Sequence, residues 1–139
     1  MPTTMTENKD LIVREWYESL WNKWNLDTVD RLFSQDYRLH VSGAQGPADR
    51  ATAKEIVRMF SKAFPDLHHD VDEIIADGDT VAARWSVTGT HQGDFQGLAP
   101  TNKPIKLSGT TFHRVNDGRI VESWLTLDNL DLMKQLGVA

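Results

Sequence analysis

Alternating polar and apolar residues near the end of the chain predict a long hairpin. Two such runs span Lys106 to Asp128 and flank a turn at Asn116–Arg119. The Asp-Gly pair inside this turn is typical of a tight hairpin, because both central residues need a positive φ. Alternation places these residues of the first strand on one face: Leu107, Gly109, Thr111, His113 and Val115. The less polar set of the returning strand is Val121, Ser123, Leu125 and Leu127. The hairpin is therefore expected to offer an apolar wall to a core or cavity.

An aromatic stripe predicts a helix near the start of the chain. Thr6 is the expected cap, and the helix should run to about Trp24. Its apolar positions are Val13, Trp16, Tyr17, Leu20, Trp21 and Trp24. Stripes of this kind are more typical of burial against a sheet than of a binding surface.

Two more helices and a short strand are expected before the middle of the chain. Asp27 caps a short helix, and residues 37–41 alternate as a strand. A longer helix should run from about Pro47 to Phe64. Pro65 ends it, because the residue before a proline avoids the helical region.

Strands are expected to dominate the second half. Residues 67–76 and 80–90 alternate as strands around a second Asp-Gly turn. The irregular segment 91–104 is rich in glycine and proline, and loops of this length often border a site. Asp128 is expected to cap a last helix.

Helices segregated from an antiparallel sheet indicate the α+β class. One domain is expected across residues 1–139, with residues 1–5 as a loose tail. A curved antiparallel sheet wrapped around the N-terminal helices would enclose a cone-shaped cavity. Such a cavity is suited to one small ligand.

Composition excludes several classes of protein. The net charge of -5 and the pI near 5.4 argue against a nucleic-acid partner, which needs a basic patch. The absence of cysteine excludes disulfides and thiolate zinc sites. No apolar run reaches the ~20 residues of a membrane span, and no secretory leader is recognisable. A cytoplasmic enzyme or binding protein, without a membrane partner, is the expectation.

Several short motifs carry a resemblance to a known family. They are Arg84-Trp85, Gly89-Thr90-His91-x-Gly93, Pro100-Thr101 and the segment Asp117 to Trp124, DGRIVESW. With them, the chain resembles the SnoaL-like polyketide cyclases, also called ester cyclases, of the nuclear transport factor 2-like superfamily. The similarity covers roughly residues 9 to 137. It implies the conical α+β barrel of that superfamily.

The resemblance also implies a chemistry, from which this chain departs. The family's characterised cyclases close a ring by intramolecular aldol condensation, without a metal or organic cofactor. An aspartate on the last strand acts as general acid/base, opposite a histidine on the preceding strand. Alignment of the Asp-Gly turn puts that aspartate at Leu125, that histidine at Thr111 and a further polar position at Gly109. Leucine cannot take a proton, so the cyclase mechanism is not carried over.

Three histidines are candidate acid/base groups, because imidazole titrates near neutral pH. His113 shares a face with Thr111, and a hydrogen-bonded structural role is its alternative. His91 opens the long loop, where the resemblance places a histidine in many relatives; a hydrogen bond that organises the loop competes with catalysis. His40 lies opposite the apolar face of its strand, and the resemblance favours a place in the cavity wall.

Substrate contacts are expected from the strands and the long loop. Trp85 and Trp124 have flat faces suited to a planar ligand, although burial or a dimer contact explains them equally well. The remaining candidates are Thr111, Leu125, Phe95 and Asp128. Asp128 already serves as the helix cap. The cluster His68–Asp70 is rejected as a metal site, because neighbouring strand residues point to opposite faces.

The leading hypothesis is a cofactor-free enzyme of the isomerase or lyase type. It would perform proton transfer, as in cyclisation, isomerisation or dehydration, on a small apolar carbonyl or polycyclic metabolite. The alternative is a non-catalytic protein that binds such a ligand. Epoxide-opening hydrolysis is weaker, because no carboxylate pair falls on the cavity face. The resemblance also implies a homodimer formed through the outer face of the sheet.

Overall fold

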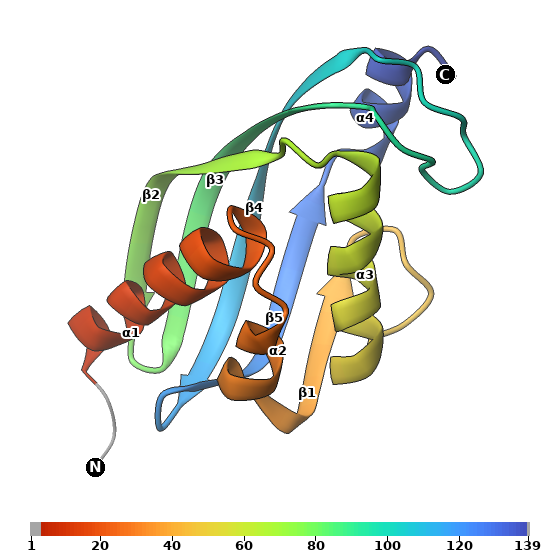
Figure 1. Cartoon of the computed structure of the whole chain (residues 1–139). Helices are drawn as coiled ribbons and strands as arrows, with labels where there is room; N and C mark the ends of the chain where they lie inside the picture. The colour runs from red at the N-terminus through yellow and green to blue at the C-terminus, as the bar shows by residue number, and fades with distance from the viewer. Residues whose placement is uncertain (1–3, 139) are drawn as a thin grey trace.

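Five strands form one mixed sheet in the part of the chain that the computed structural model describes, residues 4–138. The strands are β1 (Phe33–Val41), β2 (His68–Asp77), β3 (Thr80–Thr90), β4 (Pro104–Asn116) and β5 (Arg119–Leu127). Their order across the sheet is β1-β5-β4-β3-β2, and the sheet is open (Figure 1). The α+β class is thereby confirmed.

The sequence analysis predicted a wholly antiparallel sheet, but the observed sheet is mixed. Strands β2 to β5 form the predicted antiparallel meander, but β1 runs parallel to β5. Tight Asp-Gly turns impose an antiparallel direction on consecutive strands. Strand β1 has no hairpin partner, so its direction could not be predicted from a turn.

The helices lie mainly on one face of the sheet (Figure 1). They are α1 (Met5–Leu11), η1 (Ile12–Trp21), α2 (Asp27–Leu32), α3 (Arg50–Ala63) and α4 (Asn129–Leu136). The core fills the space between this face and the helices, and α3 and α4 contribute Ala53, Val57, Leu132 and Leu136 to it. Within the described residues, no helix is long and apolar enough to cross a membrane.

The first helix begins earlier than predicted. Thr4, rather than Thr6, is the cap: its hydroxyl accepts from the Glu7 N–H, while the Glu7 carboxylate accepts from the Thr4 N–H. This reciprocal pair is a capping box. Of the predicted tail, residues 1–3 lie outside the described residues, whereas Met5 already belongs to α1.

The aromatic segment winds as a π-helix, η1, instead of the predicted α-helix. Its buried residues recur at intervals of four and five: Ile12, Trp16, Tyr17, Leu20 and Trp21. On an α-helix these five would spread over about 180°. With about 4.4 residues per turn, as i→i+5 bonding implies, the spread falls to about 115°. The wider winding gathers the aromatic rings on one side.

The final hairpin forms as predicted, with one change of register. Asp117 and Gly118 both have positive φ, and β4 alternates between buried and exposed residues. On β5 a bulge interrupts the pairing, so that Ile120 is fully buried and Val121 is only partly buried. An extra residue reverses the parity of a strand. Ile120 therefore replaces Val121 in the inward-facing set.

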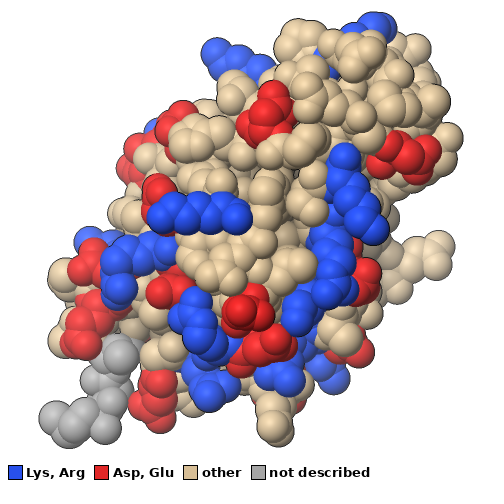
Figure 2. All heavy atoms as spheres, in the orientation of Figure 1, with Lys and Arg blue, Asp and Glu red and all other residues tan. Residues whose placement is uncertain are grey.

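Charged side chains are interspersed over the surface seen in Figure 2. Acidic and basic groups alternate over its lower part, whereas the upper right end is mostly uncharged. In Figure 1 that end carries α4 and the loop between β3 and β4. Basic side chains also form a column on the right of this view, where Figure 1 shows α3.

Candidate functional site

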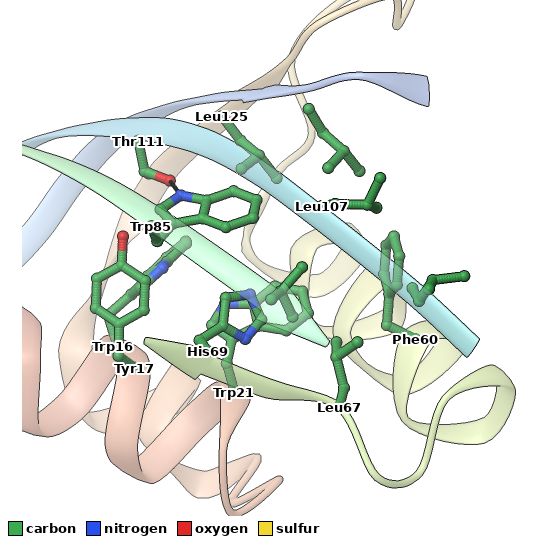
Figure 3. Close-up of a pocket in the computed structure, with 13 residues that line it drawn as sticks. Trp16, Tyr17, Trp21, Phe60, Leu67, His69, Trp85, Leu107, Thr111 and Leu125 are labelled. Atoms are coloured by element: carbon green, nitrogen blue, oxygen red, sulfur yellow. Dashed lines mark hydrogen bonds between the residues drawn. The ribbon is translucent and has the colours of Figure 1, made fainter. Parts of the chain in front are cut away.

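A largely apolar cavity lies between η1 and the inner face of the sheet (Figure 3). About 490 Å³ there is free of protein atoms, its open mouth to solvent included. Trp16, Tyr17 and Trp21 of η1 form one side. The π winding brings these three rings together, since they fall within about 80° of each other around its axis. No carboxylate belongs to the lining among the residues described.

A hydrogen bond between two strands forms the polar centre of the cavity. The Trp85 Nε1–H on β3 donates to Thr111 Oγ1 on β4 at 2.9 Å. Figure 3 shows the Tyr17 hydroxyl turned toward Thr111. Burial raises the pKa of Tyr17, and the nearby Thr111 hydroxyl offsets only part of that rise. Tyr17 therefore stays protonated and can act as a hydrogen-bond donor.

The Tyr17 hydroxyl has spare hydrogen-bonding capacity. Among the residues described, no group meets it with hydrogen-bond geometry. Thr111 likewise keeps a proton to donate, because its oxygen serves as the acceptor for Trp85. Two hydroxyl groups can thus donate toward one ligand atom in otherwise apolar surroundings.

His69 is the imidazole that lines this cavity. Its ring lies 5.4 Å from the Trp21 ring and 5.2 Å from the Trp85 ring, between centroids. Burial, with a smaller contribution from His68, lowers the pKa of His69 to about 3. The ring is therefore neutral at pH 7. Its Nδ1 atom is buried and has no hydrogen-bond partner in the described part of the chain.

Asn22 holds the backbone of His69 at the edge of the sheet. The His69 N–H donates to Asn22 Oδ1 at 2.7 Å, and Asn22 Nδ2 donates to the His69 carbonyl at 3.1 Å. Asn22 follows η1 directly as its C-cap. One amide side chain thus ties the aromatic helix to β2, and both elements contribute to the cavity.

The prediction for the hairpin wall agrees with this geometry. Leu125 lines the cavity and pairs directly with Thr111 across the two strands. Gly109 lies where only glycine fits. A Cβ atom there would be 2.5 Å from the Thr126 carbonyl oxygen and 2.5 Å from Cζ2 of Trp85. The indole therefore occupies the space that a side chain at position 109 would need.

His113 faces inward like Thr111, but it lies deeper than the cavity lining. Its Nδ1 is 2.7 Å from Ser123 Oγ, and its ring meets the Trp16 ring edge-on at 4.5 Å. Complete burial lowers the pKa of His113 to about 3. Burial also raises the pKa of the neighbouring Tyr37, whose hydroxyl faces Ser123. These groups form a second, enclosed polar cluster behind Trp16.

His91 and Phe95 belong to the long loop and do not line the cavity. His91 Nδ1 accepts from the Thr101 N–H at 3.1 Å and lies 3.0 Å from Thr101 Oγ1. These are the loop-organising hydrogen bonds expected of the alternative role. Phe95 is buried against Phe60, which lines the cavity, and against Phe64.

His40, Trp124 and Asp128 also lie away from the cavity. His40 Nε2 is 2.7 Å from a Glu122 carboxylate oxygen, and its ring stacks on Trp124 at 5.3 Å. Both rings lie on the outer face, because the neighbouring residue Leu39 faces the core. Asp128 caps α4 as predicted, accepting from the Asp131 N–H.

The structure thus brings together only part of the predicted site. Trp85, Thr111 and Leu125 line the cavity, whereas the three candidate histidines do not. His69 was missed because the pair His68-His69 was weighed only as a metal site. The alternation of Leu67, His69 and Val71 was the available signal. Within residues 4–138, no group of three His, Asp or Glu side chains is placed to hold a metal ion.

Comparison with known proteins identifies the family. Residues 11–136 match the model of the SnoaL-like polyketide cyclases. The chain belongs to the SnoaL-like polyketide cyclase family. The resemblance carried by the sequence motifs is thereby confirmed. No curated protein matches this SnoaL-like chain at a significant level.

Two Streptomyces structures share about a third of the sequence. AclR of S. galilaeus, described as "a putative hydroxylase", is 32% identical with a TM-score of 0.87, over 98% of this chain and 84% of AclR. IdmH of S. antibioticus, "a putative polyketide cyclase", is 34% identical with a TM-score of 0.82, over 95% and 99%. A SnoaL-like protein of Jannaschia sp. CCS1 is 20% identical with a TM-score of 0.88, over 97% and 94%, and supports the fold alone.

Proposed function

We propose that this SnoaL-like protein binds a small, largely apolar carbonyl compound of the polyketide type and catalyses proton transfer on it. Cyclisation, isomerisation and dehydration are reactions of this kind. One observation carries the proposal: two hydroxyl donors and one neutral imidazole line the same apolar cavity. They are Tyr17, Thr111 and His69.

The hydroxyl groups would bind the carbonyl oxygen of the substrate. Tyr17 keeps its proton because burial raises its pKa, and Thr111 is oriented by Trp85. Negative charge develops on this oxygen when a proton leaves the adjacent carbon. Donors fixed in an apolar site stabilise such charge more strongly than water does.

His69 would accept the proton. The C–H bond next to the carbonyl breaks, its electron pair forms the enolate, and the proton moves to the imidazole. A pKa near 3 makes free His69 a weak base, but a neighbouring enolate would favour the imidazolium and raise that pKa. Return of the proton to another carbon completes isomerisation. Attack of the enolate carbon on a second carbonyl closes a ring, and the alkoxide that forms takes the proton back from the imidazolium.

Leu125 is central to why a histidine is proposed. When the hairpin turns are aligned, Leu125 stands where the family's cyclases have an aspartate. The described lining contains no carboxylate that could replace it. His69 would therefore take over the acid/base role. Of the histidines first suggested by the sequence, His113 would act only indirectly, by supporting the strand that carries Thr111.

Hydrogen–deuterium exchange tests the proposal directly. A β-ketoester of an aromatic polyketide is incubated with the protein in D₂O, and exchange at the carbon between the carbonyls is followed by NMR. His69→Gln should slow the protein-dependent exchange by about 10²–10⁴-fold, the usual contribution of a positioned acid/base group. His40→Gln, on the outer face, is the matched control and should keep the wild-type rate.

Alanine variants at His40, His91 and His113 compare the two sets of histidines. If His69→Gln exchanges as fast as the wild type while one of these variants does not, the base has been assigned wrongly. The mass of any product separates proton transfer from hydroxylation, because only hydroxylation, the activity in the description of AclR, adds an oxygen atom.

A non-catalytic binding protein is the second candidate. The absence of a carboxylate from the described lining, together with the low pKa of His69, favours it. Native mass spectrometry would then detect a bound ketoester that is released unchanged and undeuterated. Protein-dependent exchange that is lost in His69→Gln would eliminate this candidate.

A further inference from the structure

The Trp85 indole forms part of the cavity wall and covers the backbone of β4. Figure 3 shows the ring among the residues that line the cavity, with its nitrogen facing Thr111 and Leu107 beyond its other end. Trp85 pairs with Gly109 across the two strands. The outer part of the ring lies where the side chain of residue 109 would project, 2.5 Å from an ideal Cβ.

Three contacts fix this position. The indole nitrogen donates to Thr111, and the ring lies against the backbone of Gly109, where no side chain blocks it. The centre of the His69 ring is 5.2 Å from that of the indole. Trp85 is almost completely buried and belongs to a central strand that is paired on both sides. The ring therefore cannot swing aside without losing a buried hydrogen bond and exposing the Thr111 oxygen.

We propose that Trp85 is a specificity-determining residue that limits the length of the fused-ring system in the ligand. This inference rests on the proposed function, because it assumes that the cavity is the ligand site. The indole fills one ring-sized volume at the Gly109 wall, and the ligand occupies only the volume that remains. A smaller residue at position 85 would join the two volumes.

The expected gain corresponds to about one aromatic ring. An apolar protein cavity on the order of 150 Å³ binds benzene, and removal of an indole opens space of that order. The Gly109 wall has no side chain to fill that space. Enlarging the cavity should therefore extend the preferred ligand by one ring while its carbonyl stays at Tyr17 and Thr111.

Two ketones that differ by one fused ring provide the test. Binding of 1-tetralone, with two rings, and of anthrone, with three, is measured by isothermal titration calorimetry. Wild-type protein should bind 1-tetralone and bind anthrone at least tenfold more weakly. Trp85→Leu should raise the affinity for anthrone at least tenfold. Trp85→Phe keeps part of the ring, and should give a gain of about threefold.

Trp124→Leu is the matched control, because Trp124 lies on the outer face. It should leave both affinities unchanged. If Trp85→Leu does not fold, as circular dichroism will show, Trp85→Phe decides the question by the same ratio of affinities. A Trp85 variant that leaves the ratio unchanged, or an equal gain in Trp124→Leu, overturns the role of Trp85.

The outcomes separate this inference from the proposed function. If wild-type protein and the Trp85 variants all bind the two ketones equally well, the cavity remains the proposed ligand site. The proposal that Trp85 limits the length of the ligand is then rejected. If neither ketone binds to any variant, the cavity does not take such compounds. Both proposals then fail together.

Discussion

His69 and Tyr17 show how single residues define the candidate site. Their neighbours in the sequence, His68 and Trp16, have different environments: His68 is exposed, and Trp16 packs on the enclosed His113. At positions 68 and 69, a displacement of one residue therefore separates an exposed group from one in the cavity, whereas Trp16 and Tyr17 both line the cavity and contact different polar groups. The chemistry of the site depends on these local directions more than on composition.

Buried neutral histidine links stability to pH. Burial lowers the pKa of His69 to about 3, against an ordinary value of 6.5. Below about pH 6.5 the unfolded chain binds a proton that the folded chain does not. The free energy of unfolding is therefore fully retained above pH 6.5. It falls by up to about 1.4 kcal/mol per pH unit as the pH decreases from there toward 3.

His69→Gln should remove part of this acid sensitivity. Urea unfolding at pH 7 and pH 4.5 gives the loss of stability on acidification, which should be smaller in the variant than in the wild type. His68→Gln, its exposed neighbour, should lose as much stability as the wild type. Equal losses in all three proteins would mean that His69 is protonated in the folded state. His113, whose pKa burial also lowers to about 3, adds to the loss of stability with falling pH in the same way.

At the level of elements, the meander strands and the presence of a helix near the start of the chain were predictable, but the π winding of that helix was not. Asp-Gly turns fix the hairpins β2–β3 and β4–β5, and the wall of β4 follows from simple alternation. The π winding of η1 escaped prediction, because residues spaced by four and five also fit an α-helix. For the same reason, Tyr17 was expected to be a buried core residue and not a site residue. The bulge that moves Ile120 inward has no clear marker in the sequence.

One amide provides the two hydrogen bonds between the end of η1 and the backbone of β2. Asn22→Ala removes both hydrogen bonds to the backbone of His69, and a net cost of about 1–3 kcal/mol in unfolding free energy is expected. The His69 amide proton should exchange faster with solvent, as measured by NMR. Lys23→Ala, the next residue along, is the control and should change neither quantity. An unaltered exchange rate in Asn22→Ala would show that the edge of β2 is held by other contacts.

At the scale of the whole molecule, we propose that the chain forms a homodimer through the outer face of the sheet. Phe112 is 48% exposed there and pairs across the strands with Trp124. Arg114 lies over the same indole at 5.3 Å. An exposed aromatic side chain beside such a cluster is typical of an interaction surface.

Light scattering tests this assembly. Wild-type protein should have the mass of two chains, and Phe112→Lys should shift the population toward one chain. Leu130→Lys changes an apolar residue on α4 that is even more exposed, at 59%, and should leave the mass unchanged. A monomeric wild type, or a dimer that tolerates Phe112→Lys, would remove the outer face from consideration.

The parallel pairing of β1 with β5 has a consequence for how the protein is made. Val41 pairs with Leu125, more than eighty positions later in the chain. During synthesis β1 therefore cannot pair with its neighbour in the sheet until almost the whole polypeptide has left the ribosome. Contacts so distant in sequence slow folding and leave strand edges open to aggregation meanwhile. Nascent chains that stop before β5 should depend on chaperones.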